Sequence, residues 1–211
     1  MTKPIIGILG AGKLGMTLAT IGRKAGYTIN IAGSTVPEKI ELAVSVMAPG
    51  ANAMQAQAVI TNSDLVILAL PLSQYQTIKP KLLENKLIID AMNYWWEIDG
   101  TENHYYEDQL TSSEAVQAYF PKSIVVKAFN HMGYHDLNDE ADNRDQPKAI
   151  AYAGNHQKAN VLVAKVINDF GFDPVYLGIL AASQPLQPGG VLFGVNATKK
   201  EIQLQLKQSL K

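Results

Sequence analysis

The chain has 211 residues, of which 47% are hydrophobic, and its formal net charge at pH 7 is −1. We expect a single domain over residues 1–211, because this length and apolar content can build one core. The near-neutral charge and the lack of a lysine–arginine cluster argue against nucleic acid or an anionic membrane as the main partner, and the lack of cysteine excludes disulfides, thiol nucleophiles and thiolate metal sites.

The first predicted element is a strand over residues 5–9, which runs directly into Gly10, Gly12 and Gly15 at G-x-G-x-x-G spacing. This combination is typical of a dinucleotide-binding loop. Gly10 would allow the tight turn, Gly12 would let a pyrophosphate approach the backbone, and Gly15 would let the next helix pack closely on the strand.

The helix expected over residues 13–25 supports this interpretation. Leu14, Leu18 and Ile21 form an apolar stripe at helical spacing, and a second stripe consists of small residues. The first turn contains no Asp or Glu, so the positive end of the helix is left for an incoming anion. The alternative is an ordinary turn between a strand and a helix.

Further strands and helices alternate along the chain. Most of the apolar runs are continuous, which is typical of strands covered on both faces. Strands are expected at residues 28–32, 51–54, 65–70, 87–90, 124–128, 149–153 and 173–177. Helices are expected at residues 37–48, 55–61, 73–84, 112–119 and 156–170. This order predicts an α/β fold of the Rossmann type, with a doubly wound, mostly parallel sheet and helices on both faces.

Two long loops and a tail complete the chain. The loops at residues 94–111 and 131–146 follow the carboxyl ends of predicted strands, where open α/β sheets bind ligands. Residues 178–211 form a short C-terminal helical extension. Its apolar positions at i, i+4 and i+8 are Ile202, Leu206 and Leu210. This stripe either docks on its own domain or packs against a second subunit, and a homodimer is the expected oligomer.

The apolar runs of the chain are short. The run over residues 65–72 is far below the roughly 20 residues that span a bilayer, and the N-terminus enters a strand without the pattern of a signal peptide. We therefore expect a cytoplasmic protein that binds small molecules and no membrane.

The end of the second strand bears on the choice between NAD and NADP. An NAD site usually places Asp or Glu there to bind the ribose 2′-hydroxyl, whereas this chain has Ser34 and Thr35. Both hydroxyls can donate to a 2′-phosphate, and Lys39 can add positive charge, which favours NADP. The alternative is a helix cap by one hydroxyl with Lys39 in solvent, and Glu38 partly offsets the lysine charge.

Five motifs follow one another at the ends of predicted strands. They are Gly10-Ala11-Gly12-Lys13-Leu14-Gly15, Ala32-Gly33-Ser34, Leu68-Ala69-Leu70-Pro71, Asp90-Ala91-Met92-Asn93 and Lys127-Ala128-Phe129-Asn130. In this order they resemble the deazaflavin-coenzyme-dependent NADP reductase family. The similarity continues through residues 170–175 to 185–190 and so covers nearly the whole chain. Related dinucleotide domains occur in the cytosolic part of transmembrane metalloreductases.

The resemblance implies hydride transfer between NADPH and a flat, flavin-like acceptor stacked on the nicotinamide. Carried over by motif, the residues that would hold the pyrophosphate are Gly10, Gly12, Lys13, Leu14 and Gly15. Those around the 2′-phosphate would be Ser34, Thr35 and Lys39. Those lining the cofactor beyond the fourth strand would be Ala69, Leu70 and Pro71, and those near the nicotinamide would be Ala128, Phe129 and Asn130. Asn93 would also bind the cofactor.

Two positions depart from the family pattern. Thr35 stands where family members commonly have Arg, which weakens the selectivity for NADP and leaves Lys39 as the main cation. His131 stands where many relatives have a small hydroxyl residue. A flavin, a deazaflavin or another small acceptor is therefore compatible with the chain.

His131 is also the candidate proton donor for a carbonyl or imine substrate, because it follows the strand predicted at residues 124–128. An incidental loop histidine is the alternative. His131 and His135 have the i, i+4 spacing of a helical metal pair, but Met132-Gly133 between them favours a loop. We expect no metal site.

Two further groups have both a structural and a functional interpretation. Asp90 and Lys127 are charges at the ends of apolar strands, and we expect a mutual ion pair. Tyr94-Trp95-Trp96 would form an aromatic wall for a planar acceptor, or would merely anchor its loop.

Three functions compete at this point. The first is an NADPH-dependent oxidoreductase acting on a flavin-like or other small planar acceptor, since hydride transfer between two rings near contact needs little acid–base machinery. The second is an NADP(H)-sensing module without turnover. The third is an imine or carbonyl reductase, which shares the N-terminal pattern.

Overall fold

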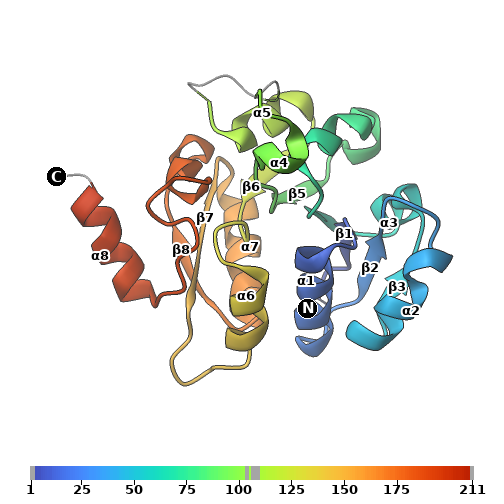
Figure 1. Cartoon of the computed structure of the whole chain (residues 1–211), viewed down its shortest axis with the longest axis horizontal. Helices are drawn as coiled ribbons and strands as arrows, with labels where there is room; N and C mark the ends of the chain where they lie inside the picture. The colour runs from blue at the N-terminus through green and yellow to red at the C-terminus, as the bar shows by residue number, and fades with distance from the viewer. Residues whose placement is uncertain (1–2, 103–104, 106–109, 210–211) are drawn as a thin grey trace.

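The computed structural model describes residues 3–102, 105 and 110–209. One sheet has the strand order β3-β2-β1-β4-β5-β6-β7-β8 (Figure 1). Its strands are β1 (Ile6–Leu9), β2 (Ile29–Ala32), β3 (Asn52–Ala53), β4 (Leu65–Leu68), β5 (Leu87–Asp90), β6 (Ile124–Lys127), β7 (Ala149–Gly154) and β8 (Asp173–Tyr176). Neighbouring strands are parallel except β6 and β7, which are antiparallel. The predicted Rossmann-type, mostly parallel sheet is confirmed.

Helices cover both faces of this sheet. They are α1 (Lys13–Lys24), α2 (Glu38–Met47), α3 (Ala56–Thr61), α4 (Trp96–Asp99), α5 (Ser112–Tyr119), α6 (Tyr134–Glu140), α7 (Gln157–Asp169) and α8 (Lys199–Ser209). Buried residues of α1, α6 and α7 share one core cluster, and those of α3 and α5 share a second. Because both faces of the central strands are buried, their sequences are continuously apolar. Within the described ranges, no helix combines the length and the apolar character needed to cross a membrane.

The prediction of one regular helix over residues 73–84 is wrong. The segment forms two 3₁₀ helices, η1 (Leu72–Thr77) and η2 (Pro80–Leu83). Proline lacks a backbone N–H and disfavours helical geometry in the residue before it. Lys79, which precedes Pro80, has an extended conformation with ψ of 124° and separates the two helices.

The two regions predicted as long loops each contain a short helix. The first holds α4 and lies partly outside the described residues, at 103–104 and 106–109. The second holds α6, which contacts α1. Leu137 is the buried residue of α6, so its acidic sequence has no apolar stripe that would have indicated a helix.

The C-terminal extension docks on its own domain. Helix α8 contacts β7 and β8 and lies at the outer end of the sheet (Figure 1). Ile202 is fully buried in a third core cluster with Ala151 of β7 and Val175 of β8, and Leu206 packs against it partly. Leu210, the last residue of the predicted stripe, lies outside the described residues. A dimer contact through the outer face of α8 stays a prediction.

Candidate functional site

Five strand ends line up at one edge of the sheet. Ala32 pairs with Leu9, Leu9 with Leu68, Leu68 with Asp90, and Asp90 with Lys127. The next residues along each strand, which begin the loops at this edge, are Gly33, Gly10, Ala69, Ala91 and Ala128. The carboxyl edge of a doubly wound sheet is where such folds bind ligands, and it gathers all five family-like motifs.

The glycine loop at this edge has the geometry that the sequence predicts. Gly10 has φ of 116°, and a Cβ there would lie 2.1 Å from the carbonyl oxygen of Ala69. A Cβ on Gly15 would lie 1.8 Å from the carbonyl oxygen of Gly10. A Cβ on Gly12, in contrast, would meet nothing within 4 Å. Two of the glycines thus let the backbones approach one another, and Gly12 leaves the loop open to a ligand.

Helix α1 begins at this loop. Its N-cap is Gly12, which has no side chain to bind the first amides, and its first turn contains no acidic residue. The N-terminal amides and the helix dipole therefore favour an anion at this end. Lys13 lies in the same turn, with its ammonium 5.3 Å from the centre of the Tyr134 ring. Leu14 packs partly against the core, so it would contribute to an anion site through its backbone.

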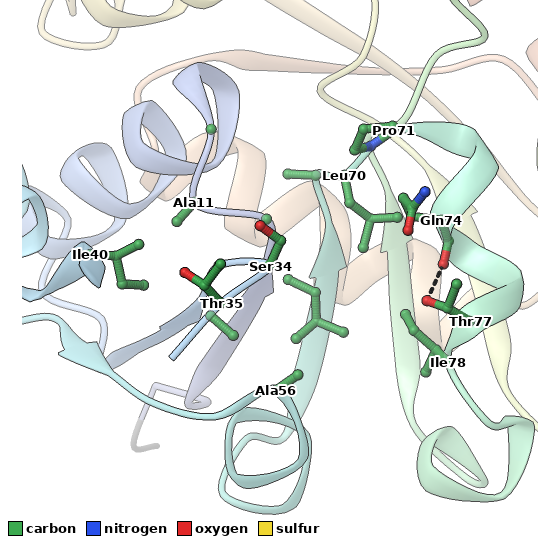
Figure 2. Close-up of a pocket in the computed structure, with 16 residues that line it drawn as sticks. Ala11, Ser34, Thr35, Ile40, Ala56, Leu70, Pro71, Gln74, Thr77 and Ile78 are labelled. Carbon is green, nitrogen blue, oxygen red and sulfur yellow. Dashed lines mark hydrogen bonds between the residues drawn. The ribbon is translucent and has the colours of Figure 1, made fainter. Parts of the chain in front are cut away.

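A cleft of about 560 Å³ opens between the glycine loop and η1. Figure 2 shows Ser34 and Thr35 on one side and Gln74, Thr77 and Ile78 on the other, with Ala56 below. The predicted residues that line the cleft are Gly10, Gly12, Ser34, Thr35, Ala69, Leu70 and Pro71. The lining residues that sequence reasoning missed include Ala11, Ile40, Ala56, Gln74, Thr77 and Ile78.

Gln74 and Thr77 form the polar part of the far wall. They are three residues apart in η1, and residues with this spacing lie on the same face of a 3₁₀ helix. The Thr77 hydroxyl donates to the carbonyl oxygen of Gln74 at 2.7 Å. Its remaining lone pairs can accept a hydrogen bond from a ligand. Their three-residue spacing would have placed Gln74 and Thr77 on one face if a 3₁₀ helix had been predicted for this segment.

The positive charge expected at the 2′-phosphate is not part of the cleft wall. Lys39 is exposed on the first turn of α2 and does not line the cleft. Ser34 and Thr35, which do line it, are exposed and carry the hydroxyl groups. None of the described residues that line the cleft is basic. Recognition of a 2′-phosphate would therefore depend on hydroxyl and amide donors, with Lys39 reaching in from outside.

Asn93 and the predicted nicotinamide residues lie beyond the cleft, after β5 and β6. Ala128 and Phe129 are fully buried, and Asn130 is buried as well. Phe129 has φ of 65°, which is unusual for a bulky residue and costs conformational energy. Asn93 donates to the Asn130 carbonyl oxygen at 2.8 Å, and the Asn130 amide donates to Asn93 Oδ1 at 2.9 Å. Reciprocal hydrogen bonds thus join the two loops.

His131 does not face the cleft as a proton donor would. It is 1% exposed, and its Nε2 accepts a hydrogen bond from the Ala151 amide at 3.0 Å. Burial lowers the pKa of His131 to about 4, although the nearby Leu192 carbonyl opposes this shift. His135 lies in α6, which starts after His131, and is exposed. The two histidines therefore belong to different elements, and His131 acts as a hydrogen-bond acceptor in the core.

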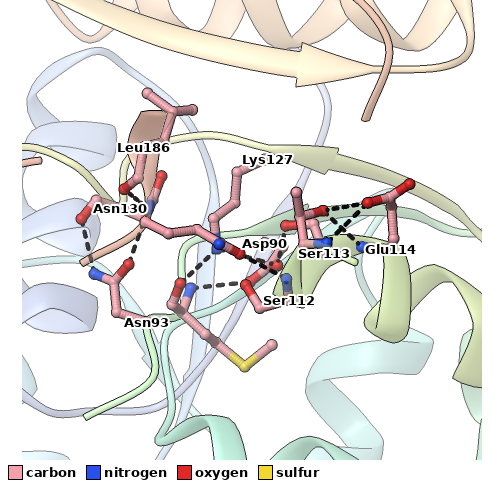
Figure 3. Close-up of polar contacts among 11 residues, drawn as sticks. Asp90, Asn93, Ser112, Ser113, Glu114, Lys127, Asn130 and Leu186 are labelled. Atoms are coloured by element: carbon pink, nitrogen blue, oxygen red, sulfur yellow. Dashed lines mark hydrogen bonds and ion pairs between the residues drawn. The ribbon is translucent and has the colours of Figure 1, made fainter. Parts of the chain in front are cut away.

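The expected ion pair between Asp90 and Lys127 is confirmed (Figure 3). Lys127 Nζ lies 3.2 Å from Asp90 Oδ2, and both side chains are essentially inaccessible to solvent. Ser113 of α5 donates to the same carboxylate oxygen at 2.6 Å. Burial lowers the pKa of Lys127, and the carboxylate beside it counteracts that effect.

Aromatic side chains follow β5 on the same edge. Trp95 is 42% exposed and Trp96 is 60% exposed. The Trp95 ring meets Phe193 edge to face, with centroids 5.5 Å apart. The buried carboxylate of Asp99 accepts from the amides of Trp95 and Ser73, both at 2.8 Å. It therefore ties the aromatic segment to η1, and so to the wall of the cleft.

Comparison with known proteins finds a family model that matches the part of the chain that forms this cleft. A family model described as NADP oxidoreductase coenzyme F420-dependent matches residues 5–94, a range that contains all 16 residues lining the cleft. A solved structure of a hypothetical protein from Sinorhizobium meliloti is 31% identical, with a TM-score of 0.83, and the match covers 94% of this chain and 96% of that one.

Two more distant similarities extend over most of the chain. A candidate F420-dependent NADP reductase from Arthrobacter sp. is 21% identical, with a TM-score of 0.72 and coverage of 98% of this chain and 95% of that one, which shows the shared fold. The metalloreductase STEAP3 of Rattus norvegicus is 24% identical over 186 residues. That match covers 87% of this chain and 36% of the rat protein, so the chain spans little more than a third of this relative.

Proposed function

Because the chain belongs to the coenzyme F420-dependent NADP oxidoreductase family, we propose that it transfers hydride between NADP(H) and a flat, flavin-like acceptor. The observation that carries this proposal is the open position at Gly12, in front of a helix N-terminus without acidic residues. A diphosphate fits such a loop, since the amides can donate to it and no side chain fills the approach.

With the diphosphate at the glycine loop, the two ends of the dinucleotide would lie on opposite sides of that loop. The adenosine end would lie between Ser34–Thr35 and Gln74–Thr77. The nicotinamide end would lie over the ends of β5 and β6, near Asn93 and the Ala128–Asn130 loop. When bound, NADPH supplies the hydride. The protein residues hold its two ends apart along the aligned strand ends and present the nicotinamide to an acceptor.

Hydride transfer to a flavin-like ring is favoured over reduction of a carbonyl or imine. Those substrates need a proton donor beside the nicotinamide. His131, the candidate from the sequence, is buried and already accepts a hydrogen bond from Ala151. The exposed Trp95 and Trp96 instead offer aromatic surface on the nicotinamide side, which suits a planar acceptor.

The proposal is tested by mixing the protein with NADPH or NADH and following nucleotide oxidation with FMN, FAD, riboflavin and the deazaflavin coenzyme in turn. We expect turnover with at least one of these acceptors, and faster turnover with NADPH. Tight NADPH binding without oxidation by any of them would contradict the proposal and favour a sensing module.

The aromatic wall is tested by Trp95→Ala. We expect the KM for the acceptor to rise about fivefold, because a stacking surface is lost, while the affinity for NADPH stays unchanged. Tyr176→Ala is the matched control, since Tyr176 is a similarly exposed aromatic residue on β8, far from the β5 loop in the strand order. An unaltered acceptor KM in the Trp95 variant would remove the wall from the proposal.

A further inference from the structure

The buried ion pair of Asp90 and Lys127 holds the backbone of Met92 from both sides. The Met92 amide donates to Asp90 Oδ1 at 2.9 Å, and Lys127 Nζ donates to the Met92 carbonyl oxygen at 2.5 Å. Both main-chain polar groups of this one residue are thus bound to the pair. Since Asn93 is the next residue, the pair fixes the start of the loop that carries it.

The same pair also bears on the loop after β6. Lys127 directly precedes Ala128, Phe129 and Asn130, and Phe129 is held in a left-handed conformation. Such a conformation persists where the surroundings determine it strongly. Asn130 is bound in turn, because its amide donates to Asn93 Oδ1 and to the Leu186 carbonyl oxygen at 2.7 Å (Figure 3). Hydrogen bonds thus join the ion pair to Met92, the peptide chain leads from Met92 to Asn93, and hydrogen bonds join Asn93 to Asn130 in the second loop.

Pairing of β5 with β6 does not require these charges. The two strands already form a parallel ladder from residues 87–90 to residues 124–127. Just before their other ends, Glu84 and Lys122 form a second ion pair at 3.1 Å whose lysine is 70% exposed. Burying two charges is costly unless their geometry and hydrogen bonds compensate for lost water. The Asp90–Lys127 pair is buried despite this cost, and it lies at the carboxyl edge, where the two loops begin.

We propose that Asp90, Lys127 and Ser113 are positioning residues, which hold the loops of Asn93 and Asn130 in the arrangement that binds the nicotinamide half of NADPH. This inference rests on the proposed function for the identity of the ligand. It assigns the buried pair to the nicotinamide half of the ligand, because the residues proposed around the adenosine half lie after β2 and on α3 and η1, and no hydrogen bond among the described residues joins them to the pair.

The test compares a whole ligand with a fragment of it. Calorimetry measures the affinity for NADPH and for adenosine 2′,5′-bisphosphate, which lacks the nicotinamide half. In Asp90→Asn/Lys127→Met we expect the NADPH affinity to fall about tenfold, since the Met92 carbonyl oxygen loses the hydrogen bond that Lys127 donates, while the fragment affinity is unchanged. Removing both charges together leaves no unpaired buried ion, so this variant is the one suited to folding.

Two further variants provide a milder change to the same site and a control at a different ion pair. Ser113→Ala removes one partner of Asp90 and should cause a smaller loss that is likewise confined to NADPH. Glu84→Gln/Lys122→Met removes an ion pair between the same two strands at their opposite ends and should change neither affinity. A merely structural role would lower the melting temperature without changing the ratio of the two affinities.

Equal losses for NADPH and the fragment, or a folded double variant with wild-type NADPH affinity, would overturn the inference. A wild-type protein that binds NADPH no more tightly than the fragment would overturn it too. Failure of hydride transfer, with the NADPH-specific loss still present, would instead count against the proposed acceptor chemistry and leave the positioning role supported.

Discussion

Gly12 and Gly15 belong to one motif but have different surroundings. A Cβ on Gly12 would meet no atom within 4 Å, and its φ of −78° suits any residue. A Cβ on Gly15 would lie 1.8 Å from the Gly10 carbonyl oxygen, so α1 would have to move away from the loop. The absence of a side chain therefore serves the ligand at Gly12 and the packing of the fold at Gly15.

These two glycines should respond differently to the same change. We expect Gly12→Ala to keep a nearly unchanged melting temperature and to bind NADPH about tenfold more weakly, because its methyl group occupies the approach of the phosphates. Gly15→Ala should lower the melting temperature by several degrees, because backbone atoms cannot yield easily. Thermal unfolding and calorimetry on both proteins separate the roles. Wild-type NADPH affinity in Gly12→Ala would contradict the phosphate assignment.

The cleft residues that belong to a contiguous sequence motif could be predicted from the sequence. Gly10 and Gly12 line the cleft as expected, because G-x-G-x-x-G spacing after a strand identifies both the tight turn and the open approach to the loop. Gln74 and Thr77 could not be found in this way, since they reach the cleft from η1, across from the glycine loop. The burial of His131 depends on Ala151 and on the C-terminal segment, which are distant in sequence.

Some helices and strands of the fold could likewise be predicted from the sequence, and others could not. The strands are predictable because burial on both faces makes them continuously apolar, and Thr111 with Glu114 forms the capping box that starts α5 at the predicted residue. Helix α6 is not, because a single buried leucine gives no periodic pattern. Pro80 alone could have excluded a regular helix through residues 73–84, since proline cannot continue one.

Helix α8 offers a test of docking at this scale. Ile202 is fully buried against β7 and β8, whereas Leu204, two residues along the same helix, is 56% exposed. We expect Ile202→Ala to lower the free energy of unfolding by about 3 kcal/mol, through lost burial and the cavity left behind.

Leu204→Ala is the matched control for α8, because it removes the same kind of side chain from the outer face. Its free energy of unfolding in denaturant titrations should stay close to that of the wild type. A dependence of either value on protein concentration would instead support packing of α8 against a second subunit. Equal effects of the two substitutions would contradict docking through Ile202.

At the scale of the whole molecule, His131 adds a link between the loop after β6 and the antiparallel strand β7. The antiparallel strands β6 and β7 pair through Val126–Gly154 and Lys127–Ala153. Beyond them, His131 Nε2 accepts from the Ala151 amide, as a strand carbonyl would. The His131 carbonyl oxygen also accepts from the Gly194 amide at 2.7 Å. The loop after β6 thereby joins the sheet to the C-terminal segment.

This arrangement requires a neutral imidazole, because Nε2 can accept a hydrogen bond only when it carries no proton. Burial lowers the pKa of His131 from 6.5 to about 4 in the folded protein. Between these two values the unfolded chain binds more protons than the folded chain, so stability rises with pH. The full contribution is present above pH 6.5 and is lost as the pH falls toward 4.

We therefore expect the free energy of unfolding to fall by about 3 kcal/mol between pH 6.5 and pH 4 through this histidine alone. His131→Gln keeps an acceptor for the Ala151 amide but cannot titrate, so its stability curve should lack this loss. His135→Gln is the control, because His135 is exposed on α6 and its replacement should leave the wild-type curve unchanged. Chemical denaturation at successive pH values gives all three curves, and their difference removes the contribution of the carboxylates that titrate in the same range. If His131→Gln loses stability in acid as steeply as the wild type, then His131 is not the group that couples protonation to unfolding.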